Sequence, residues 1–195
     1  AMNLANELAR EIPYSFQFNQ FENPSNPKIH ANTTAKEIWE QSNQNIDGLI
    51  TGIGTGGTVT GCGDFLKKVN PQCKIYAVEP KKSAVISGGK AGSHAIQGIG
   101  AGFIPKVLKT ELIDEIIQVE DEEAFYYGRL LARMEGLLSG ISSGAALAAT
   151  IQIGQRKELI NKRLIVILPS YGERYLSTPM FDTNSSILAR DDGFL

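Results

Sequence analysis

The chain has 195 residues, a length that suits one ordinary domain with a buried core. Its net charge of −2 does not indicate binding to nucleic acid or to an anionic membrane. No apolar run approaches the roughly 20 residues of a membrane span. Two cysteines, Cys62 and Cys73, and two histidines, His30 and His94, argue against a disulfide framework and a zinc site. We therefore expect a protein of a reducing compartment, most simply the cytoplasm.

Helical and strand-like patterns alternate along the chain. Helices are expected over residues 2–11, 34–41, 58–69, 121–136 and 142–156. Strands are expected over residues 14–18, 47–51, 74–78, 116–119 and 163–169, and residues 23–27 are expected to form a loop. Thr34 and Glu37 fit a capping box, and Asp121 is the expected N-cap of the helix that follows it. The alternation predicts an α/β fold with a mainly parallel sheet.

Glycine is the one unusual count, with 20 residues, nine of which lie in three clusters, at 52–57, 98–102 and 140–144. The first and third clusters follow apolar segments that end at Ile50 and Leu138. They are therefore expected at the carboxyl ends of strands, where open parallel sheets bind ligands. The second cluster follows no clear strand and is expected to be a loop.

The first cluster contains Gly54, Thr55, Gly56, Gly57 and Thr58, between a strand and a helix. Backbone amides at a helix start lack acceptors, the helix dipole favours an anion there, and glycines let a phosphate approach the backbone. The two threonines add hydroxyl donors. The pattern thus predicts a phosphate site, with a tight turn that binds nothing as the alternative.

These residues do not determine which phosphate-bearing ligand would bind. Gly52, Gly54 and Gly57 match the G-x-G-x-x-G pattern of dinucleotide folds, and Glu79 follows where such folds place a ribose-binding acid. Glu79 is interpreted instead as a strand-end acid that holds a loop. A Walker loop is excluded, because no lysine follows Gly57.

Four blocks in the same order resemble O-acetylserine sulfhydrylase, the cysteine synthase family. The blocks are residues 52–58, 97–105, 140–146 and 168–178, and residues 23–30 are also similar to that family. The resemblance implies a fold-type II enzyme with a tryptophan-synthase-β-like, three-layer α/β sandwich, pyridoxal 5'-phosphate as cofactor, and formation of cysteine and acetate from O-acetylserine and sulfide. A cytoplasmic homodimer is expected.

The resemblance also assigns roles to single residues. Gly54, Thr55, Gly56, Gly57 and Thr58 match the phosphate-binding loop. Gly98 matches a glycine beside the cofactor, and Ser142 matches a serine whose hydroxyl faces the pyridine nitrogen. A neutral serine there leaves the nitrogen unprotonated, which favours prompt loss of the β-substituent. Ser143 is expected to cap the helix that begins there.

Two segments of the family pattern do not occur in this sequence. None of the twelve lysines is followed by aspartate, so the lysine that forms the Schiff base is absent, and no Ser-Gly-Asn substrate loop exists. We expect no catalytic residue in this chain and no activity from it alone. The expected organisation is a remnant of a small amino-terminal domain at 1–13, an incomplete larger cofactor-binding domain at 14–180, and a tail at 181–195.

A loop that binds serine acetyltransferase in the family is also altered here. Lys90 and His94 match its basic residues, but Ala95 stands where relatives have a second lysine. Docking of that partner is therefore an open question. The alternatives to a cysteine synthase component are a cystathionine β-synthase-like relative, a non-catalytic module that binds phosphate or the acetyltransferase tail, and a nicotinamide dinucleotide domain.

Overall fold

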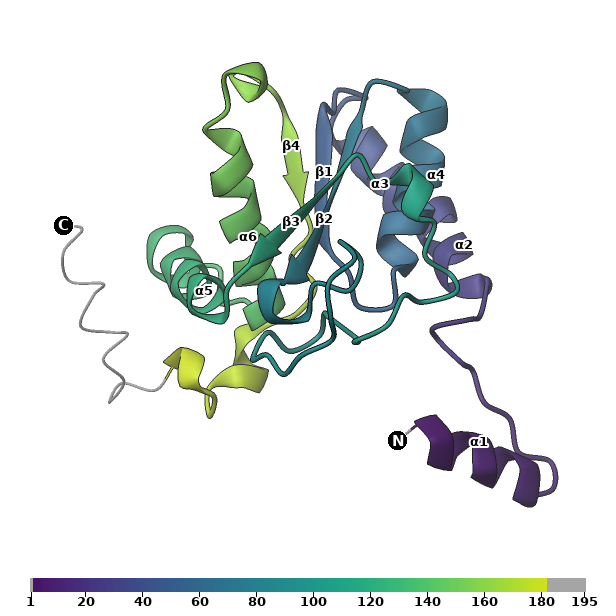
Figure 1. Cartoon of the computed structure of the whole chain (residues 1–195). Helices are drawn as coiled ribbons and strands as arrows, with labels where there is room; N and C mark the ends of the chain where they lie inside the picture. The colour runs from purple at the N-terminus through teal and green to yellow at the C-terminus, as the bar shows by residue number, and fades with distance from the viewer. Residues whose placement is uncertain (1, 182–195) are drawn as a thin grey trace.

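A computed structural model describes residues 2–181 and shows a parallel sheet with helices on both faces (Figure 1). The helices are α1 (Met2–Glu11), α2 (Ser25–Asn32), α3 (Thr34–Gln41), α4 (Gly57–Val69), α5 (Asp121–Glu135) and α6 (Ile141–Gly154). The strands are β1 (Gly48–Gly52), β2 (Lys74–Pro80), β3 (Glu115–Val119) and β4 (Leu164–Val166). They lie in the order β3-β2-β1-β4, and each neighbouring pair is parallel. The expected α/β fold is confirmed.

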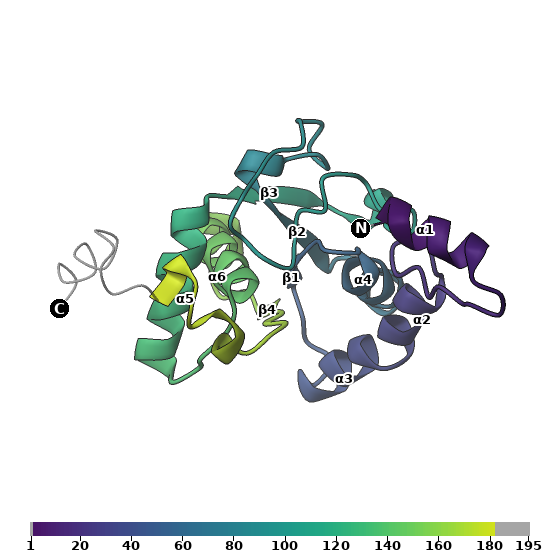
Figure 2. The same ribbon diagram turned by 90° about the horizontal axis from the view of Figure 1, so that it is seen from below.

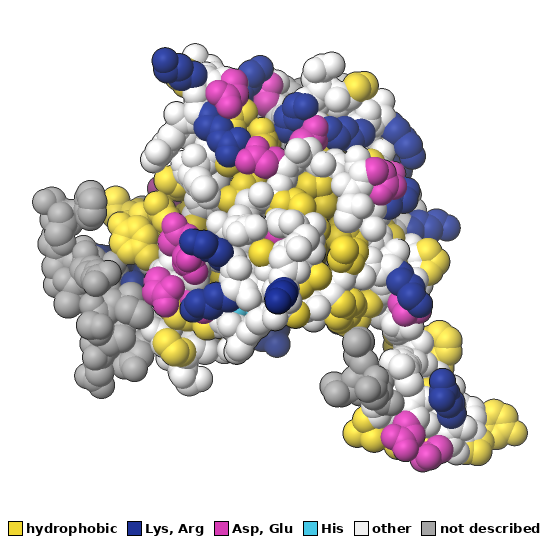
Figure 3. Space-filling view, viewed as in Figure 1, with side chains coloured by type: hydrophobic (Ala, Val, Ile, Leu, Met, Phe, Trp, Pro, Cys, Tyr) yellow, Lys and Arg dark blue, Asp and Glu magenta, His cyan; other side chains and the backbone are white. Residues whose placement is uncertain are grey.

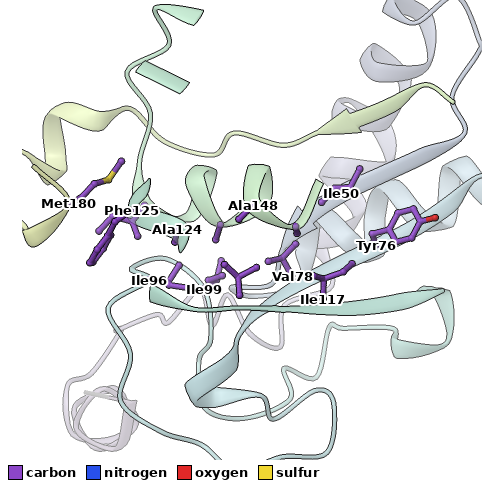
Figure 4. Packing of buried hydrophobic residues seen from close by; sticks show 14 of the residues in the cluster. Ile50, Tyr76, Val78, Ile96, Ile99, Ile117, Ala124, Phe125, Ala148 and Met180 are labelled. Atoms are coloured by element: carbon purple, nitrogen blue, oxygen red, sulfur yellow. The ribbon is translucent and has the colours of Figure 1, made fainter. Parts of the chain in front are cut away.

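The sheet separates two hydrophobic cores, because successive side chains of a strand point to opposite faces. In β1, Ile50 belongs to the core under α5 and α6, whereas Leu49 belongs to the core under α3 and α4. Figure 4 shows Ile50, Val78 and Ile117, from three strands, facing the helix that carries Ala148. Figures 1 and 2 show α5 and α6 on one side of the sheet and α2, α3 and α4 on the other, which is a three-layer sandwich.

The α5–α6 pair fixes the position of the amino end of α6. A Cβ atom on Gly144 would overlap the carbonyl oxygen of Ala124 and would lie 2.7 Å from the amide nitrogen of Gly128. Glycine at these crossings therefore lets the two backbones approach closely. The first turn of α6, at Ile141, is held by this contact beside the carboxyl end of the sheet.

Two expectations near the amino terminus are wrong. Residues 14–18 form no strand: they are exposed, and Tyr14 has a left-handed φ of 61°. An alternating pattern makes a strand only where a neighbouring strand accepts its hydrogen bonds. Residues 23–27 are only partly a loop, because α2 begins at Ser25. Pro24 precedes it with a φ of −65°, a value already suited to a helix start.

Two capping predictions are also wrong. Thr34 is the first residue of α3 rather than its N-cap, and no side chain caps that helix. The N-cap of α5 is Glu120 rather than Asp121. Its carboxylate accepts from the backbone of Glu123, while the Glu123 carboxylate accepts from the amide of Glu120 at 2.9 Å. The capping box thus exists, but in a different helix from the one predicted.

The amino-terminal helix α1 projects away from the sheet, as Figures 1 and 3 show. Leu4, Leu8 and Ile12 are each more than 40% exposed, and Phe16 and Phe18 beyond the helix are more than 75% exposed. No helix within residues 2–181 is long and apolar enough to cross a membrane. The expected tail at 181–195 lies outside the described residues, apart from Phe181.

Candidate cofactor site

The first glycine cluster connects the carboxyl end of β1 to the start of α4. Gly56 is the N-cap of α4 and has a left-handed φ of +83°. A Cβ atom at this position would lie 2.8 Å from Cδ1 of Leu108. Both the backbone conformation and the packing therefore require glycine at residue 56.

This loop presents donors that have no acceptor in the described part of the chain. Within residues 2–181, the backbone amides of Thr55, Gly56 and Thr58 donate no hydrogen bond, while the amide of Gly57 donates to Oγ1 of Thr55 at 3.2 Å. Free amides at the positive end of a helix suit an anion. The tight-turn alternative explains the conformation of the loop but not these free donors.

The second glycine cluster is a loop, as expected, and it lies against the first. A Cβ atom on Gly54 would come within 2.5 Å of the carbonyl oxygen of Gly98, and the amide of Gly100 donates to the carbonyl of Ile53 at 3.0 Å. Gly98 and Gly100 have left-handed φ values of 97° and 70°. The two clusters thus share one wall of the site because neither carries a side chain there.

The third cluster brings Ser142 to the same place. A Cβ atom on Gly98 would lie 3.5 Å from Oγ of Ser142, and the serine is only 3% exposed. The structure gives the Ser142 hydroxyl no hydrogen-bond partner among residues 2–181. It therefore brings Gly54, Gly98 and Ser142 side by side from three separate parts of the sequence.

Two details of the third cluster differ from expectation. Residues before it form no strand of the sheet: Ser139 makes only an isolated antiparallel bridge with Tyr171. Ser143 does not cap α6, because the N-cap is Gly140 and Ser143 lies inside the first turn. Its hydroxyl is fully buried without a partner in the described chain. The serine run is set by the packing of α6 rather than by capping.

Glu79 supports the neighbouring loop, as the sequence indicated. The residue is 1% exposed at the end of β2, and its carboxylate accepts from the amides of Ile86 and Ser87 at 2.9 and 3.1 Å. The Ser87 hydroxyl also donates to it. A carboxylate already occupied in this way has little capacity left for a ribose hydroxyl, which argues against a dinucleotide site.

The lysines lie in surface settings. All twelve are described: eleven are exposed, and the half-buried Lys67 pairs with Asp114. Six exposed lysines also pair with carboxylates. The hydrogen bonds that Lys74 and Lys81 donate to the carboxylates of Asp114 and Glu120 raise the pKa of both lysines. Such ammonium groups are poor nucleophiles at neutral pH.

The two basic residues of the altered loop have different environments. Lys90 is exposed, whereas His94 is half-buried and its Nε2 lies 3.0 Å from the carbonyl oxygen of Gly100. Because a carbonyl only accepts, Nε2 carries the proton, and His94 supports the second glycine loop. No group of three or more metal-binding side chains occurs in the described residues.

Sequence reasoning missed two side chains that contact the first glycine loop from α2. Nδ2 of Asn26 donates to Oγ1 of Thr55 at 2.9 Å, and Nε2 of His30 lies 3.5 Å from Oγ1 of Thr58. Asn26 lies in the stretch 23–27 that the sequence predicts as a loop, and His30 lies three residues beyond it. The repeated Asn-Pro spacing was the available signal, but it did not indicate which loop these side chains would contact.

Comparison with known proteins identifies the family. The family described as "Pyridoxal-phosphate dependent enzyme" matches residues 1–170, and the chain belongs to it. It is 50% identical over 190 residues to the cysteine synthase of Buchnera aphidicola, a match that covers 93% of this chain and 60% of that protein. It superposes on the cysteine synthase of Entamoeba histolytica with a TM-score of 0.90 and 41% identity, over 98% of this chain and 58% of that one. O-ureido-L-serine synthase gives a TM-score of 0.88 and 38% identity, over 95% of this chain and 58% of that one.

These relatives are longer than this chain, which spans about 60% of the length of the proteins it matches. The donor set nevertheless fits the family cofactor. Within residues 2–181 three amides of the first loop have no acceptor and suit a phosphate, and the Ser142 hydroxyl has no partner and suits a ring nitrogen. The glycines at residues 54 and 98 leave the wall between them free of side chains.

Proposed function

We propose that this chain forms the phosphate and ring-nitrogen side of a pyridoxal-phosphate site in an enzyme of cysteine biosynthesis. The proposed reaction converts O-acetylserine and sulfide to cysteine and acetate. The observation that carries the proposal is the convergence of three glycine clusters, which place Gly54, Gly98 and Ser142 together beside a helix start with free amides. The similarity to two cysteine synthases supports the choice of reaction.

Each part of the site has a distinct task in this proposal. Gly54, Thr55, Gly56, Gly57 and Thr58 hold the phosphate through backbone amides and two hydroxyls. When bound, pyridoxal phosphate supplies an electron sink for substrate chemistry. Ser142 offers the ring nitrogen a hydroxyl rather than a carboxylate, so this residue does not hold a proton on it. Gly98 leaves room for the ring because it has no side chain.

The exposed lysines support a further part of the proposal, that this chain alone is inactive. The family lysine must reach the cofactor and act as a base, and neither role suits a solvated ammonium group paired with a carboxylate. The test is to mix the 195-residue chain with cofactor, O-acetylserine and sulfide and to measure cysteine, with and without the amino-terminal portion of a cysteine synthase.

We expect cysteine only in the mixture that contains the second portion. Robust cysteine formation by the chain alone, with one lysine trapped by borohydride, would contradict the inactivity of the chain. Cofactor binding without cysteine in either mixture would instead favour a non-catalytic binding module. The cystathionine β-synthase-like alternative predicts product from serine rather than from O-acetylserine. Binding of NAD in place of pyridoxal phosphate would favour the dinucleotide alternative.

Assembly, partners and location are part of the same proposal. The exposed apolar residues Leu4, Leu8 and Ile12 support a homodimer or another contact through α1, which light scattering would test. Lys90 remains a candidate contact for serine acetyltransferase, whereas His94 is occupied by Gly100. The division into residues 1–13, 14–180 and 181–195 and a cytoplasmic location remain predictions.

A further inference from the structure

Helix α2 lies directly against the amino end of α4, because glycines there leave room for it. A Cβ atom on Gly57 would overlap the side chain of Asn26, and one on Gly61 would overlap the carbonyl oxygen of Pro27 and lie 2.7 Å from Cβ of His30. The contact places two polar side chains of α2, one turn apart, over the phosphate loop. Neither is needed to close the hydrophobic core.

Asn26 determines the orientation of the Thr55 hydroxyl. Its Nδ2 donates to Oγ1 of Thr55 at 2.9 Å and to the carbonyl oxygen of Gln20, also at 2.9 Å. Oγ1 of Thr55 accepts a second hydrogen bond from the amide of Gly57. A hydroxyl has two acceptor sites and one hydrogen, so both acceptor sites are used. The hydrogen of Thr55 is therefore left to donate, and it has no acceptor in the described chain.

His30 contacts the hydroxyl of Thr58 in the way that Asn26 contacts the hydroxyl of Thr55. Its Nδ1 lies 3.0 Å from Oγ1 of Thr34, and its Nε2 lies 3.5 Å from Oγ1 of Thr58. Partial burial lowers the pKa of His30, so the ring is neutral at pH 7 and carries a single N–H. If Thr34 donates to Nδ1, the proton is on Nε2 and points to Thr58. The hydroxyl hydrogen of Thr58 is then also free to donate.

We propose that α2 is a second layer of the phosphate site, in which Asn26, together with His30, fixes the threonine hydroxyls as donors toward the phosphate. Asn26 and His30 are positioning residues, since they act through Thr55 and Thr58. The inference rests on the proposed phosphate site and extends it to a helix outside the loop. A phosphate dianion accepts hydrogen bonds only, so a loop that presents donors alone binds it better than one with a free acceptor.

The test compares pyridoxal 5'-phosphate with pyridoxal, which lacks the phosphate, by titration calorimetry on the 195-residue chain. We expect Asn26→Ala to weaken binding of the phosphate form about tenfold, which corresponds to about 1.4 kcal/mol, and to leave pyridoxal binding unchanged. Asn26→Asp should be worse, because its carboxylate would accept the Thr55 hydrogen and would repel the anion. Asn32→Ala, on an exposed residue of the same helix, is the matched control.

A double-mutant cycle separates positioning from packing. Because Asn26 acts through the Thr55 hydroxyl, Asn26→Ala should add almost nothing to the loss caused by Thr55→Val. Additive losses, or an equal loss for pyridoxal and its phosphate, would overturn the proposal and leave Asn26 as a packing residue. Circular dichroism confirms that each variant is folded, and the near-isosteric Asn26→Asp provides the measurement if the alanine variant unfolds.

The control titration of the unaltered chain distinguishes this inference from the one on which it rests. If that chain binds neither pyridoxal phosphate nor inorganic phosphate, the phosphate site itself is wrong and the role of α2 is rejected with it. If the unaltered chain binds the phosphate form and Asn26→Ala binds it equally well, only the role of α2 is rejected.

Discussion

Backbone amides at the start of α5 have hydrogen-bond acceptors, whereas those at the start of α4 largely lack them in the described chain. At α5 the Glu120 and Glu123 carboxylates and backbones satisfy one another in a capping box. At α4 the N-cap is glycine, no side chain caps the helix, and neighbouring amides stay without acceptors in the described chain. A helix start that supplies its own anions is structural. One that lacks them at the carboxyl end of a parallel strand is available to a ligand.

The difference has a cost in stability at α4. Gly57, Gly61 and Gly63 lower the helix propensity of α4, and α2 covers the same turn because small residues leave it open. The start of α5 is instead complete within four residues of sequence. The comparison therefore indicates that the start of α4 depends on tertiary contacts for its stability, whereas the start of α5 depends mainly on its own side chains.

The largest effect is expected at the glycine of the α4 N-cap. Gly56→Ala should weaken binding of pyridoxal phosphate on the order of 100-fold, because the new Cβ displaces the loop from Leu108 and misplaces its donors. Gly136→Ala is the matched control, because Gly136 also has a left-handed φ, at the end of α5, and no atom of the described residues lies within 4 Å of an added Cβ. Gly136→Ala should lower the free energy of unfolding by about 1 kcal/mol and leave the affinity for pyridoxal phosphate unchanged. If both variants bind pyridoxal phosphate with equal affinity, the loop at Gly56 is only a turn and does not bind the phosphate.

The second effect concerns alkaline pH. Both cysteines lie in the core under α3 and α4, and burial raises the pKa of Cys62 to about 12 and of Cys73 to about 11. Burial raises the pKa of each thiol in the folded state above its unfolded value of 9.0. The resulting contribution to folding stability is fully present below pH 9.0 and is lost as pH rises toward 11 or 12. Ionisation of each thiol in the unfolded state should lower the free energy of unfolding by about 1.4 kcal/mol at pH 10.

Denaturant unfolding between pH 8 and pH 10 measures this loss, and hydrogen exchange should show α4 opening before α5. The control is the double variant Cys62→Ala and Cys73→Ala, which keeps every lysine and tyrosine. The interpretation fails if that variant loses as much stability between pH 8 and pH 10 as the unaltered chain.

A smaller effect is expected at the start of α5. Glu123→Ala removes one half of the capping box and should lower the free energy of unfolding by about 1 kcal/mol. Affinity for pyridoxal phosphate should not change, because this helix start is structural. Thermal unfolding and the same titration measure the two quantities. A tenfold loss of affinity would show that α5 also contributes to the site.

The smallest effect on stability is expected at the start of α6. Ser142→Ala and Ser143→Ala each remove a hydroxyl that has no partner in the described chain, so each should change stability by less than about 0.5 kcal/mol. Only Ser142→Ala should alter the absorbance and fluorescence of bound pyridoxine 5'-phosphate, which report protonation of the ring. Identical spectra for the two variants would contradict the contact between Ser142 and the ring nitrogen.

Local patterns were sufficient for much of the fold. The expected strand at 74–78 and the helix at 58–69 were found as β2 and α4, because their apolar spacing matches burial on the sheet and against it. The position of the glycine loop between β1 and α4 was predictable for the same reason, since a strand, a glycine run and a helix follow one another directly. The supporting role of Glu79 also followed from its place at a strand end.

Other features were decided by contacts between distant parts of the chain. The sequence could not show that α2 would replace a loop and contact Thr55 through Asn26, because glycines at residues 57 and 61 create that space. Nor could it show that Gly98 would lie between Gly54 and Ser142. Residues 14–18 illustrate the converse, since an alternating pattern without a neighbouring strand stayed exposed. Sequence determined the elements and the loop chemistry by local spacing, whereas tertiary structure decided which hydroxyls and amides share one site, because that depends on how closely backbones pack.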